Sequence, residues 1–466
     1  MQSKYKLSFQ AFVCSFLLVV SAQSYAAVFD VTPSQVPAEL LRKFSEVYQS
    51  IKSQYVEEVD DNKLFIDAMN GALAGLDPHS NYLDYEGLKD FGIATKGEFG
   101  GIGIEVTMED GVVKVVSPIE DTPAYRAGIR TGDLILELDG NSAKGLTMGD
   151  AIKRMRGKPD TKIMLGISRK SESGLVNITL TRAVIKNPSV KYKLTDAGYP
   201  YVRITQFQEK TGEDLAKTLA EIREKTPGPL KGLVLDLRNN PGGLVTTAVA
   251  VGSAFLKKDS LIVYSDGRIP DAKMRLYANP KNYVGEVEED DYLRNLPEEI
   301  KTVPMVVLVN AGSASASEIV AGALQDHKRA KILGTQSFGK GTIQTLLPLS
   351  SGSAVKLTIA KYFTPNGRSI QAKGITPDYL VDDPALTPDE DAKQRREATL
   401  SHHLANPTDT PTVKKTDNKT VIIEKEAPKT QFSDNFILES GTEKDFQYAQ
   451  AINLLKGAAV ERVKSN

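Results

Sequence analysis

Hydrophobic residues recur every three or four positions in the first part of the chain, and this spacing predicts helices over 37–91. Pro78 disfavours helical geometry at the residue before it, so the turn 76–80 is expected to end the second helix. We interpret 27–95 as an N-terminal helical region. One apolar face of its first helix would be formed by Leu40, Leu41, Phe44, Val47 and Ile51.

The hydrophobic period changes to two between 97 and 184, which favours strands. A helical pattern over 146–155 interrupts them, and the Thr147 hydroxyl can cap that helix. A small β-rich domain is therefore expected at 96–182. Its strands are expected at 102–106, 112–116, 134–138, 163–167 and 176–180.

Strands alternate with helices from 201 to 378, which is typical of an α/β layered fold. The apolar runs 233–237 and 305–309 are nearly continuous, as expected of strands that are buried on both faces. This core is expected to occupy 183–381. Its helices are expected at 212–225, 245–255 and 317–325.

The composition becomes polar and rich in proline over 382–430, which is typical of a linker. The C-terminal segment 431–466 contains an amphipathic helix, 445–460. Three partners could cover its apolar face: the body of the same chain, a second copy in a homo-oligomer, or an adaptor protein. That face would be formed by Phe446, Ala449, Ile452, Leu455 and Ala459.

A chain of 466 residues exceeds what one hydrophobic core usually serves, so these parts fit a multidomain α/β (α+β) protein. The formal net charge is −1, from 58 basic and 59 acidic residues. This balance disfavours nucleic acid and anionic membranes as partners.

The N-terminus has the features of a secretory signal peptide. Two lysines precede an apolar run over 9–20, and small residues follow at 24–27. The run is shorter than the ~20 residues of a membrane-spanning helix, which is the alternative. We therefore expect removal of 1–26, with cleavage near residue 26 or 27, a periplasmic location and no integral membrane segment afterwards. Cys14, the single cysteine, would be lost with this segment, so no disulfide is expected.

A turn with three serines follows the run 305–309 and leads into a helix. A hydroxyl at such a turn is little covered and lies at a helix N-terminus, where unpaired N–H groups favour developing negative charge. Ser315 is thus a candidate nucleophile. The alternative is that a serine only caps the helix, with Glu318 completing a capping box from Ser315.

A second loop places Lys340 between two glycines. Glycine on both sides permits close approach of other residues, which can desolvate the amine and lower its pKa far enough for it to act as a base. The alternatives are a solvated loop lysine and a phosphate-binding loop. The phosphate-binding alternative fails because Gly341 stands where Ser or Thr would hold magnesium, and a strand pattern follows.

Histidine, the usual partner of a catalytic serine, is poorly placed for that role. His402 and His403 fall in the polar segment, His79 in the N-terminal turn, and His327 at the far end of the helix that Ser315 begins. At about 1.5 Å per residue, that helix puts His327 ~15 Å or more from Ser315. No cluster has metal-ligand spacing, so neither a metal nor another cofactor is expected.

A glycine-rich loop follows the other buried strand. Gly242 and Gly243 expose backbone N–H groups that could bind an oxyanion together with the amide of Ala316. Each such donor contributes roughly 3 to 4 kcal/mol in acyl transfer. The alternative, a tight turn between strand and helix, is compatible with this role.

The three loops together resemble the C-terminal processing, or tail-specific, serine peptidases, which have a PDZ domain and a Ser/Lys catalytic type. Three motifs stand in that family's order: LRNNPGG at 237–243, GSASASE at 312–318 and FGKGTIQ at 338–344. The lysine follows the serine by 25 positions, and the resemblance covers roughly 40–378. It extends to KYFTPNGRSIQ at 361–371 and GITPD at 374–378.

The resemblance implies a serine endopeptidase in which Ser315 is the nucleophile, Lys340 the general base and Gln344 the residue that orients the lysine. Gln344 can accept a hydrogen bond from the amine and hold it toward the serine. Ser313 and Ser317 become supports of the turn. The choice between the two glycines as oxyanion donor stays open.

The resemblance also implies that 96–182 is a PDZ domain. Gly101, Ile102, Gly103 and Ile104 would then form the loop that binds a C-terminal carboxylate, while an added peptide strand pairs with the sheet. Taken alone, this glycine pattern would indicate no more than a hairpin bulge.

The expected substrates are periplasmic or envelope proteins with free, apolar C-termini, cleaved through an acyl-enzyme. The resemblance adds a helical-repeat adaptor protein as a possible partner of the C-terminal helix. A hypothesis of another class is a non-catalytic PDZ scaffold that retains the peptidase fold.

Overall fold

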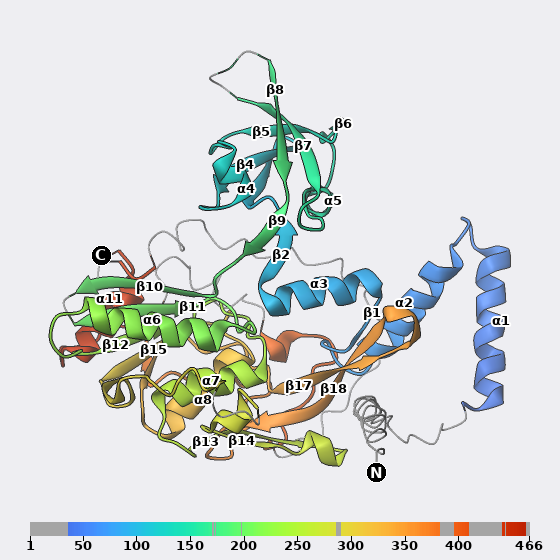
Figure 1. Cartoon of the computed structure of the whole chain (residues 1–466). Helices are drawn as coiled ribbons and strands as arrows, with labels where there is room; N and C mark the ends of the chain where they lie inside the picture. Colours follow the sequence, from blue (N-terminus) through green and yellow to red (C-terminus); the bar gives the residue numbers. More distant parts are fainter. Residues whose placement is uncertain are drawn as a thin grey trace, which may run out of the picture. The chain divides into compact units, whose positions relative to one another are not determined.

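The computed structural model describes residues 36–169, 172, 174–196, 198–285, 290–382, 396–409, 440–442 and 444–462 (Figure 1). The predicted signal peptide and most of the predicted linker lie outside these residues. The chain divides into two compact units between Asp67 and Ala68, inside helix α2 (Asp61–Ala74).

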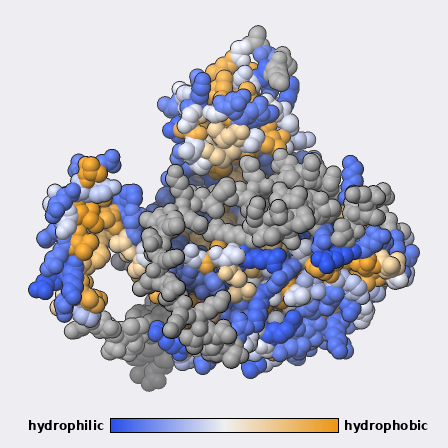
Figure 2. Space-filling view, turned by 180° about the vertical axis from the view of Figure 1, so that it is seen from behind, coloured by the Kyte–Doolittle hydropathy of each residue, from blue (hydrophilic) through white to orange (hydrophobic). Residues whose placement is uncertain are grey.

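The first unit contains helix α1 (Ala38–Gln54) and the start of α2, as the helical periodicity predicts. The ring of Phe65 lies against those of Phe44 and Tyr48, with centroids 6.0 and 5.4 Å apart. Figure 2 shows hydrophobic side chains gathered over α1. Among the described helices, none is long and apolar enough to cross a membrane. The exposed apolar residues of α1 include Leu40, Leu41 and Val47.

The second unit includes the β-rich domain, an antiparallel sheet of order β3-β4-β5-β7-β8 with β6 paired to β5 (Figure 1). Thr147 Oγ1 accepts from the Asp150 N–H and caps the second helix, as predicted. The antiparallel pair β2 (Glu98–Gly101) and β9 (Ala183–Lys186) connects this domain to the rest of the unit. Its elements are β3 (Ile104–Glu109), β4 (Val112–Pro118), α4 (Pro123–Arg126), β5 (Leu134–Leu138), β6 (Asn141–Ser142), α5 (Met148–Met155), β7 (Lys162–Ser168) and β8 (Leu175–Thr181).

The α/β core is built on a sheet of order β10-β11-β12-β15-β16-β19. Its strands from β11 to β19 are parallel, and β10 is antiparallel to β11. Leu233 and Leu235 are buried in one hydrophobic cluster with residues of α6, α7 and α8, whereas Val234 is buried in another. Both faces of the central strands are therefore covered, as predicted. The elements are β10 (Val190–Asp196), β11 (Tyr199–Ile204), α6 (Thr211–Lys225), β12 (Leu233–Asp236), α7 (Val245–Phe255), β15 (Met305–Val309), α8 (Ala316–Asp326), β16 (Lys331–Gly334) and β19 (Tyr379–Leu380).

The C-terminal helix α11 (Phe446–Leu455) covers the second face of this sheet. Tyr448, Ala451 and Ile452 are buried with Val234 and with residues of β15 and β16. The sequence left three partners open for the apolar face of this helix, and in the structure the body of the same chain covers it. The helix is shorter than the predicted 445–460, because Gly457 takes a left-handed conformation with φ 73° just beyond its end.

A second, smaller sheet lies beside the core and has the order β1-β18-β13-β14, with β17 paired to β18. Its first strand comes from the N-terminal helical region and is followed by α3, so the predicted arm is not entirely helical. The elements are β1 (Asn81–Leu83), α3 (Tyr85–Lys96), β13 (Leu261–Gly267), β14 (Arg275–Tyr277), β17 (Thr342–Pro348) and β18 (Ala354–Phe363).

Residues 396–409 differ from the prediction of a polar linker over 382–430. Glu397 is fully buried, and its N–H donates to Phe338 O at 3.1 Å. Asn406 is buried as well and donates to Gln371 O at 2.7 Å. The polar composition that suggests a linker here supplies hydrogen bonds to the core instead.

Candidate active site

Ser315 stands between β15 and α8, in a backbone conformation that non-glycine residues rarely adopt, with φ 54° and ψ −113°. Such a conformation persists only where the surroundings hold it. Ser313 Oγ donates to Leu237 O at 2.7 Å, and Ser317 Oγ donates to Asn240 O at 2.9 Å. The two outer serines are thus supports of the turn, as predicted.

The glycine-rich loop lies directly against this turn. Gly242 has φ 97°, and a Cβ at this position would lie 2.7 Å from Ala314 O and 2.8 Å from Ser315 Cβ. Only glycine fits there without displacing the serine. The Gly242 N–H donates to Asn240 Oδ1 at 2.9 Å.

Glu318 joins the serine turn to the lysine loop. Its fully buried carboxylate accepts from the N–H groups of Ser315, Gly339 and Lys340 at 2.8, 2.7 and 3.0 Å, and from Ser337 Oγ at 2.5 Å. Burial raises the pKa of Glu318 to about 7, although these four donors favour its ionised form. The capping contact between the Ser315 N–H and Glu318, which the sequence offered as the alternative to a nucleophile, is present, but the same carboxylate also binds three donors of the lysine loop.

The environment of Lys340 disfavours its charge. Burial lowers the pKa of the Lys340 amine to about 8, with a further contribution from the positive charge of Lys356. Glu397, Glu318 and Asp77 oppose this shift, because each favours the ammonium. A lysine in this environment can lose its proton near neutral pH.

Tyr362 provides a second link between the two loops. Its buried hydroxyl donates to Lys340 O and lies 3.1 Å from Ser315 O. The backbones on both sides of the site are therefore held by one side chain of β18.

Gln344 does not contact the lysine in the way the resemblance implies. Its Nε2 donates to Thr342 Oγ1 at 3.0 Å and to Thr358 Oγ1 at 3.1 Å. Within the described residues, no hydrogen bond joins Lys340 Nζ to either Ser315 or Gln344. Both N–H groups of the amide are engaged, so its oxygen is the atom left to face a donor. Hydrogen bonds among catalytic groups often form only once substrate is bound.

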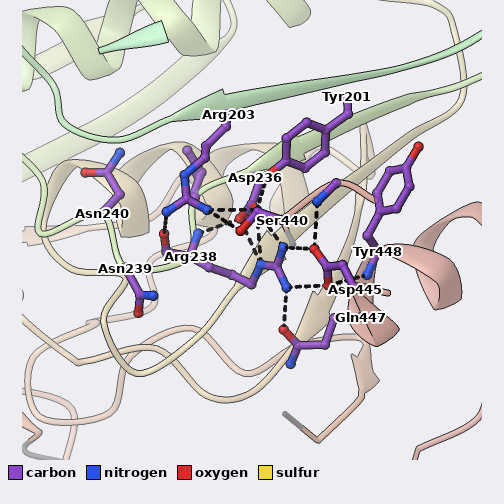
Figure 3. Close-up of polar contacts among 12 residues, drawn as sticks. Tyr201, Arg203, Asp236, Arg238, Asn239, Asn240, Ser440, Asp445, Gln447 and Tyr448 are labelled. Atoms are coloured by element: carbon purple, nitrogen blue, oxygen red, sulfur yellow. Dashed lines mark hydrogen bonds and ion pairs between the residues drawn. The ribbon is translucent and has the colours of Figure 1, made fainter. Parts of the chain in front are cut away.

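A network of buried charged side chains joins Arg238, in the glycine-rich loop, to Asp445 at the N-terminus of α11 (Figure 3). Arg238 donates to both Asp236 and Asp445, with Nη2 2.7 Å from Asp236 Oδ2 and 2.6 Å from Asp445 Oδ2. Gln447 Oε1 accepts from Arg238 Nη1 at 3.0 Å, and the Tyr201 hydroxyl donates to Asp236 Oδ2 at 2.6 Å. Burial opposes the charge of Arg238, but the two carboxylates outweigh it and raise its pKa well above the usual value. The N-terminus of α11 thereby anchors the loop that leads to Gly242.

Asp445→Ala is expected to lower the free energy of unfolding by about 3 to 5 kcal/mol, because it leaves the Arg238 charge buried with one carboxylate fewer. Urea denaturation measures this loss. Lys217→Ala, which breaks the exposed pair of Lys217 with Glu213, is the matched control and should cost far less stability. Equal losses in the two variants would contradict a structural role for the buried network.

The predicted carboxylate-binding loop connects β2 to β3. Gly103 has φ 81°, and a Cβ there would lie 2.3 Å from Thr122. The carbonyls of Ile102 and Gly103 accept from Ala124 N and Ile119 N at 2.9 and 3.0 Å, so they point toward α4 and the turn before it. Strand β3 lies at the edge of its sheet. The loop and an open strand edge are therefore adjacent.

Neither His327 nor His79 is hydrogen-bonded to Ser315. His327 Nε2 is 2.7 Å from Leu261 O, and His79 Nε2 is 2.8 Å from Glu397 Oε2. In the part of the chain that the structure describes, no group of three or more His, Cys, Asp or Glu residues could hold a metal ion.

Comparisons with known proteins agree with the motifs. The family model for peptidase family S41 matches residues 198–381, and a PDZ domain model matches 100–180. A model for the N-terminal domain of the activating protease CtpB matches 20–87. The carboxy-terminal-processing protease of Bartonella bacilliformis is 46% identical over 368 residues, which cover 79% of this chain and 80% of that protein. This chain belongs to peptidase family S41.

Further S41 relatives include the carboxy-terminal processing protease CtpA of Bacillus subtilis, 36% identical over 73% of this chain and 69% of that protein. Among solved structures, the photosystem II D1 C-terminal processing protease is 31% identical over 73% of this chain and 86% of that chain, with a TM-score of 0.41. The chain is a serine-type S41 endopeptidase with a PDZ domain, as the resemblance implied. The hypothesis of a non-catalytic scaffold receives no support from these relatives.

Proposed function

We propose that this chain is an exported endopeptidase that takes protein substrates by their C-terminal tails and cleaves them through an acyl-enzyme on Ser315. The observation that carries the proposal is the Glu318 carboxylate, which accepts N–H donors from both Ser315 and Lys340. The strained serine and the desolvated lysine therefore belong to one rigid unit. Export rests on the signal-peptide pattern of 1–26.

The reaction assigns one role to each side chain. Ser315 Oγ attacks the scissile carbonyl carbon while the neutral Lys340 Nζ takes the hydroxyl proton, and the resulting ammonium donates it to the leaving amine. Water then hydrolyses the ester to regenerate Ser315. With a pKa of about 8, roughly a tenth of Lys340 is neutral at pH 7. Gln344 Oε1 accepts from the ammonium and orients it.

The proposed oxyanion donors are the amides of Gly243 and Ala316. The Gly242 N–H already donates to Asn240, whereas within the described residues the N–H groups of Gly243 and Ala316 have no acceptor. Gly242 instead supplies the close approach between the two loops. Each donor aimed at the oxyanion contributes roughly 3 to 4 kcal/mol to the transition state.

Substrate choice is assigned to the PDZ domain. A peptide tail would add a strand along the open edge of β3, with its carboxylate at the loop formed by Gly101, Ile102, Gly103 and Ile104. The exported substrates would accordingly be those with free, apolar C-termini.

Two unfolded reporter peptides that differ only in a free or an amidated apolar C-terminus test this function. Amidation should lower kcat/KM by about 10- to 100-fold, since it removes hydrogen bonds to a charged group worth about 1.5 to 3 kcal/mol. An acylating serine reagent should label Ser315, as located by mass spectrometry of the peptides. Equal cleavage of both reporters would contradict tail recognition, and labelling elsewhere would contradict the nucleophile.

A further inference from the structure

The turn Asp77–Ser80 lies outside residues 198–381, which match the peptidase model, yet its side chains are hydrogen-bonded to Thr358 and Glu397. Asp77 and Ser80 are buried, with 4% and 5% of their surfaces exposed. The turn leads into β1, which pairs with β18 from Asn81 opposite Lys356 to Leu83 opposite Ala354. Strand β18 in turn pairs with β17, which carries Gln344. The turn is therefore connected through β18 to the strand that carries Gln344.

Asp77 sets the direction of a hydrogen-bond chain to Gln344. Its carboxylate accepts from the N–H groups of His79 and Ser80, from Ser80 Oγ at 2.7 Å and from Thr358 Oγ1 at 3.0 Å. Burial opposes ionisation of Asp77, but these donors outweigh it and hold its pKa below the usual value. An ionised carboxylate can only accept, so Thr358 must donate to Asp77.

The direction of the hydrogen bond from Thr358 to Asp77 in turn determines the orientation of the Gln344 amide. Since the single proton of Thr358 Oγ1 points at Asp77, this hydroxyl can only accept from Gln344, whose Nε2 lies 3.1 Å away. The amide nitrogen is thereby turned toward Thr358 and Thr342. The amide oxygen remains available to accept a hydrogen bond, as an acceptor for an ammonium must.

His79, in the same turn, is connected to the lysine loop. His79 Nε2 lies 2.8 Å from Glu397 Oε2, and Glu397 Oε1 accepts from Gln371 Nε2 at 2.9 Å. Gln371 Oε1 accepts from the N–H of Gly341 at 2.9 Å, directly after Lys340. The turn thus reaches both members of the lysine and glutamine pair by separate paths.

We infer that the turn Asp77–Ser80 is a positioning element for catalysis, which orients the Gln344 amide through Thr358 and braces the Lys340 loop through Glu397 and Gln371. The inference rests on the proposed function, because it depends on the proposed roles of Lys340 as base and Gln344 as the residue that orients it. A positioning role explains why this turn, which precedes the PDZ domain, contains buried polar residues.

Thr358→Val tests the path to Gln344 with little change of shape, since valine is also β-branched and suits a strand. In the full chain, kcat for the free-tail reporter should fall about 10- to 100-fold with KM unchanged, the scale expected when a catalytic group is misoriented. Thr358→Ser retains the hydroxyl and should restore most of kcat. Thermal unfolding midpoints of both variants show whether the fold is retained.

A double-mutant cycle separates positioning from a merely structural role. On a Gln344→Ala background, Thr358→Val should lower kcat less than about two-fold further, because the residue through which it acts is gone. Losses that multiply would overturn the inference, as would a Thr358→Val enzyme with wild-type kcat.

Ser315→Ala, measured in parallel, distinguishes failure of the positioning role from failure of the proposed function. If it is inactive while Thr358→Val is fully active, the positioning role is wrong and the proposed function stands. If it cleaves as well as wild type, the proposed function itself is wrong.

Discussion

Ser315→Ala is expected to lower kcat/KM for the free-tail reporter on the order of 10⁴-fold or more, because no acyl-enzyme can form without the nucleophile. Alanine adopts the backbone conformation of Ser315 no less readily than serine does, and the bonds that hold the turn come from Ser313, Ser317 and Glu318. The unfolding midpoint should therefore stay close to that of wild type. Initial rates and thermal unfolding measure the two effects.

Ser317→Ala is the matched control within the same turn. Asn240 O, which accepts from Ser317 Oγ, also accepts from the Ala314 N–H at 3.0 Å and so stays paired. The expected cost is about 1 kcal/mol of stability. The acylating reagent should label Ser317→Ala but not Ser315→Ala. The reverse result would show that the nucleophile has been assigned to the wrong serine.

The α/β core and its three loops could be predicted from the sequence because local patterns carry them. The apolar runs that become β12 and β15 pair in parallel, with Leu233 opposite Met305, so their carboxyl ends meet at one edge of the sheet. The loops that follow these strands must then lie close together. Small residues around Ser315 and glycines around Lys340 are short-range signals for a tight turn and a desolvated amine.

The supports of the site could not be predicted, because they join residues far apart in the chain through polar side-chain contacts. Arg238 and Asp445 are separated by 207 positions, and His79 and Glu397 by 318. Such pairs leave no periodicity in the sequence. The prediction of a linker was wrong for residues 396–409, because buried polar side chains that bind a core have the same composition as a solvated linker.

Lys340→Ala is expected to lower kcat about as far as Ser315→Ala does, on the order of 10⁴-fold, because nucleophile and base act as one unit. Since the N–H of Lys340, rather than its side chain, bonds to Glu318, the loop should keep its position in the variant. The double variant Ser315→Ala/Lys340→Ala should be no less active than either single one. A Lys340→Ala enzyme that retains a tenth of wild-type kcat would contradict the role of general base.

The pH dependence of the wild-type enzyme should identify the same lysine. The pKa of Lys340 is about 8, so kcat/KM should be low while the ammonium persists and should rise as the pH passes through 8. Lys356→Gln removes a neighbouring positive charge that lowers this pKa. The acidic limb should therefore move to higher pH in this variant, with an unchanged plateau, since the neutral amine is the same base once formed. A limb that stays in place or moves to lower pH would show that another group controls the rate, because loss of a nearby cation can only favour the protonated lysine.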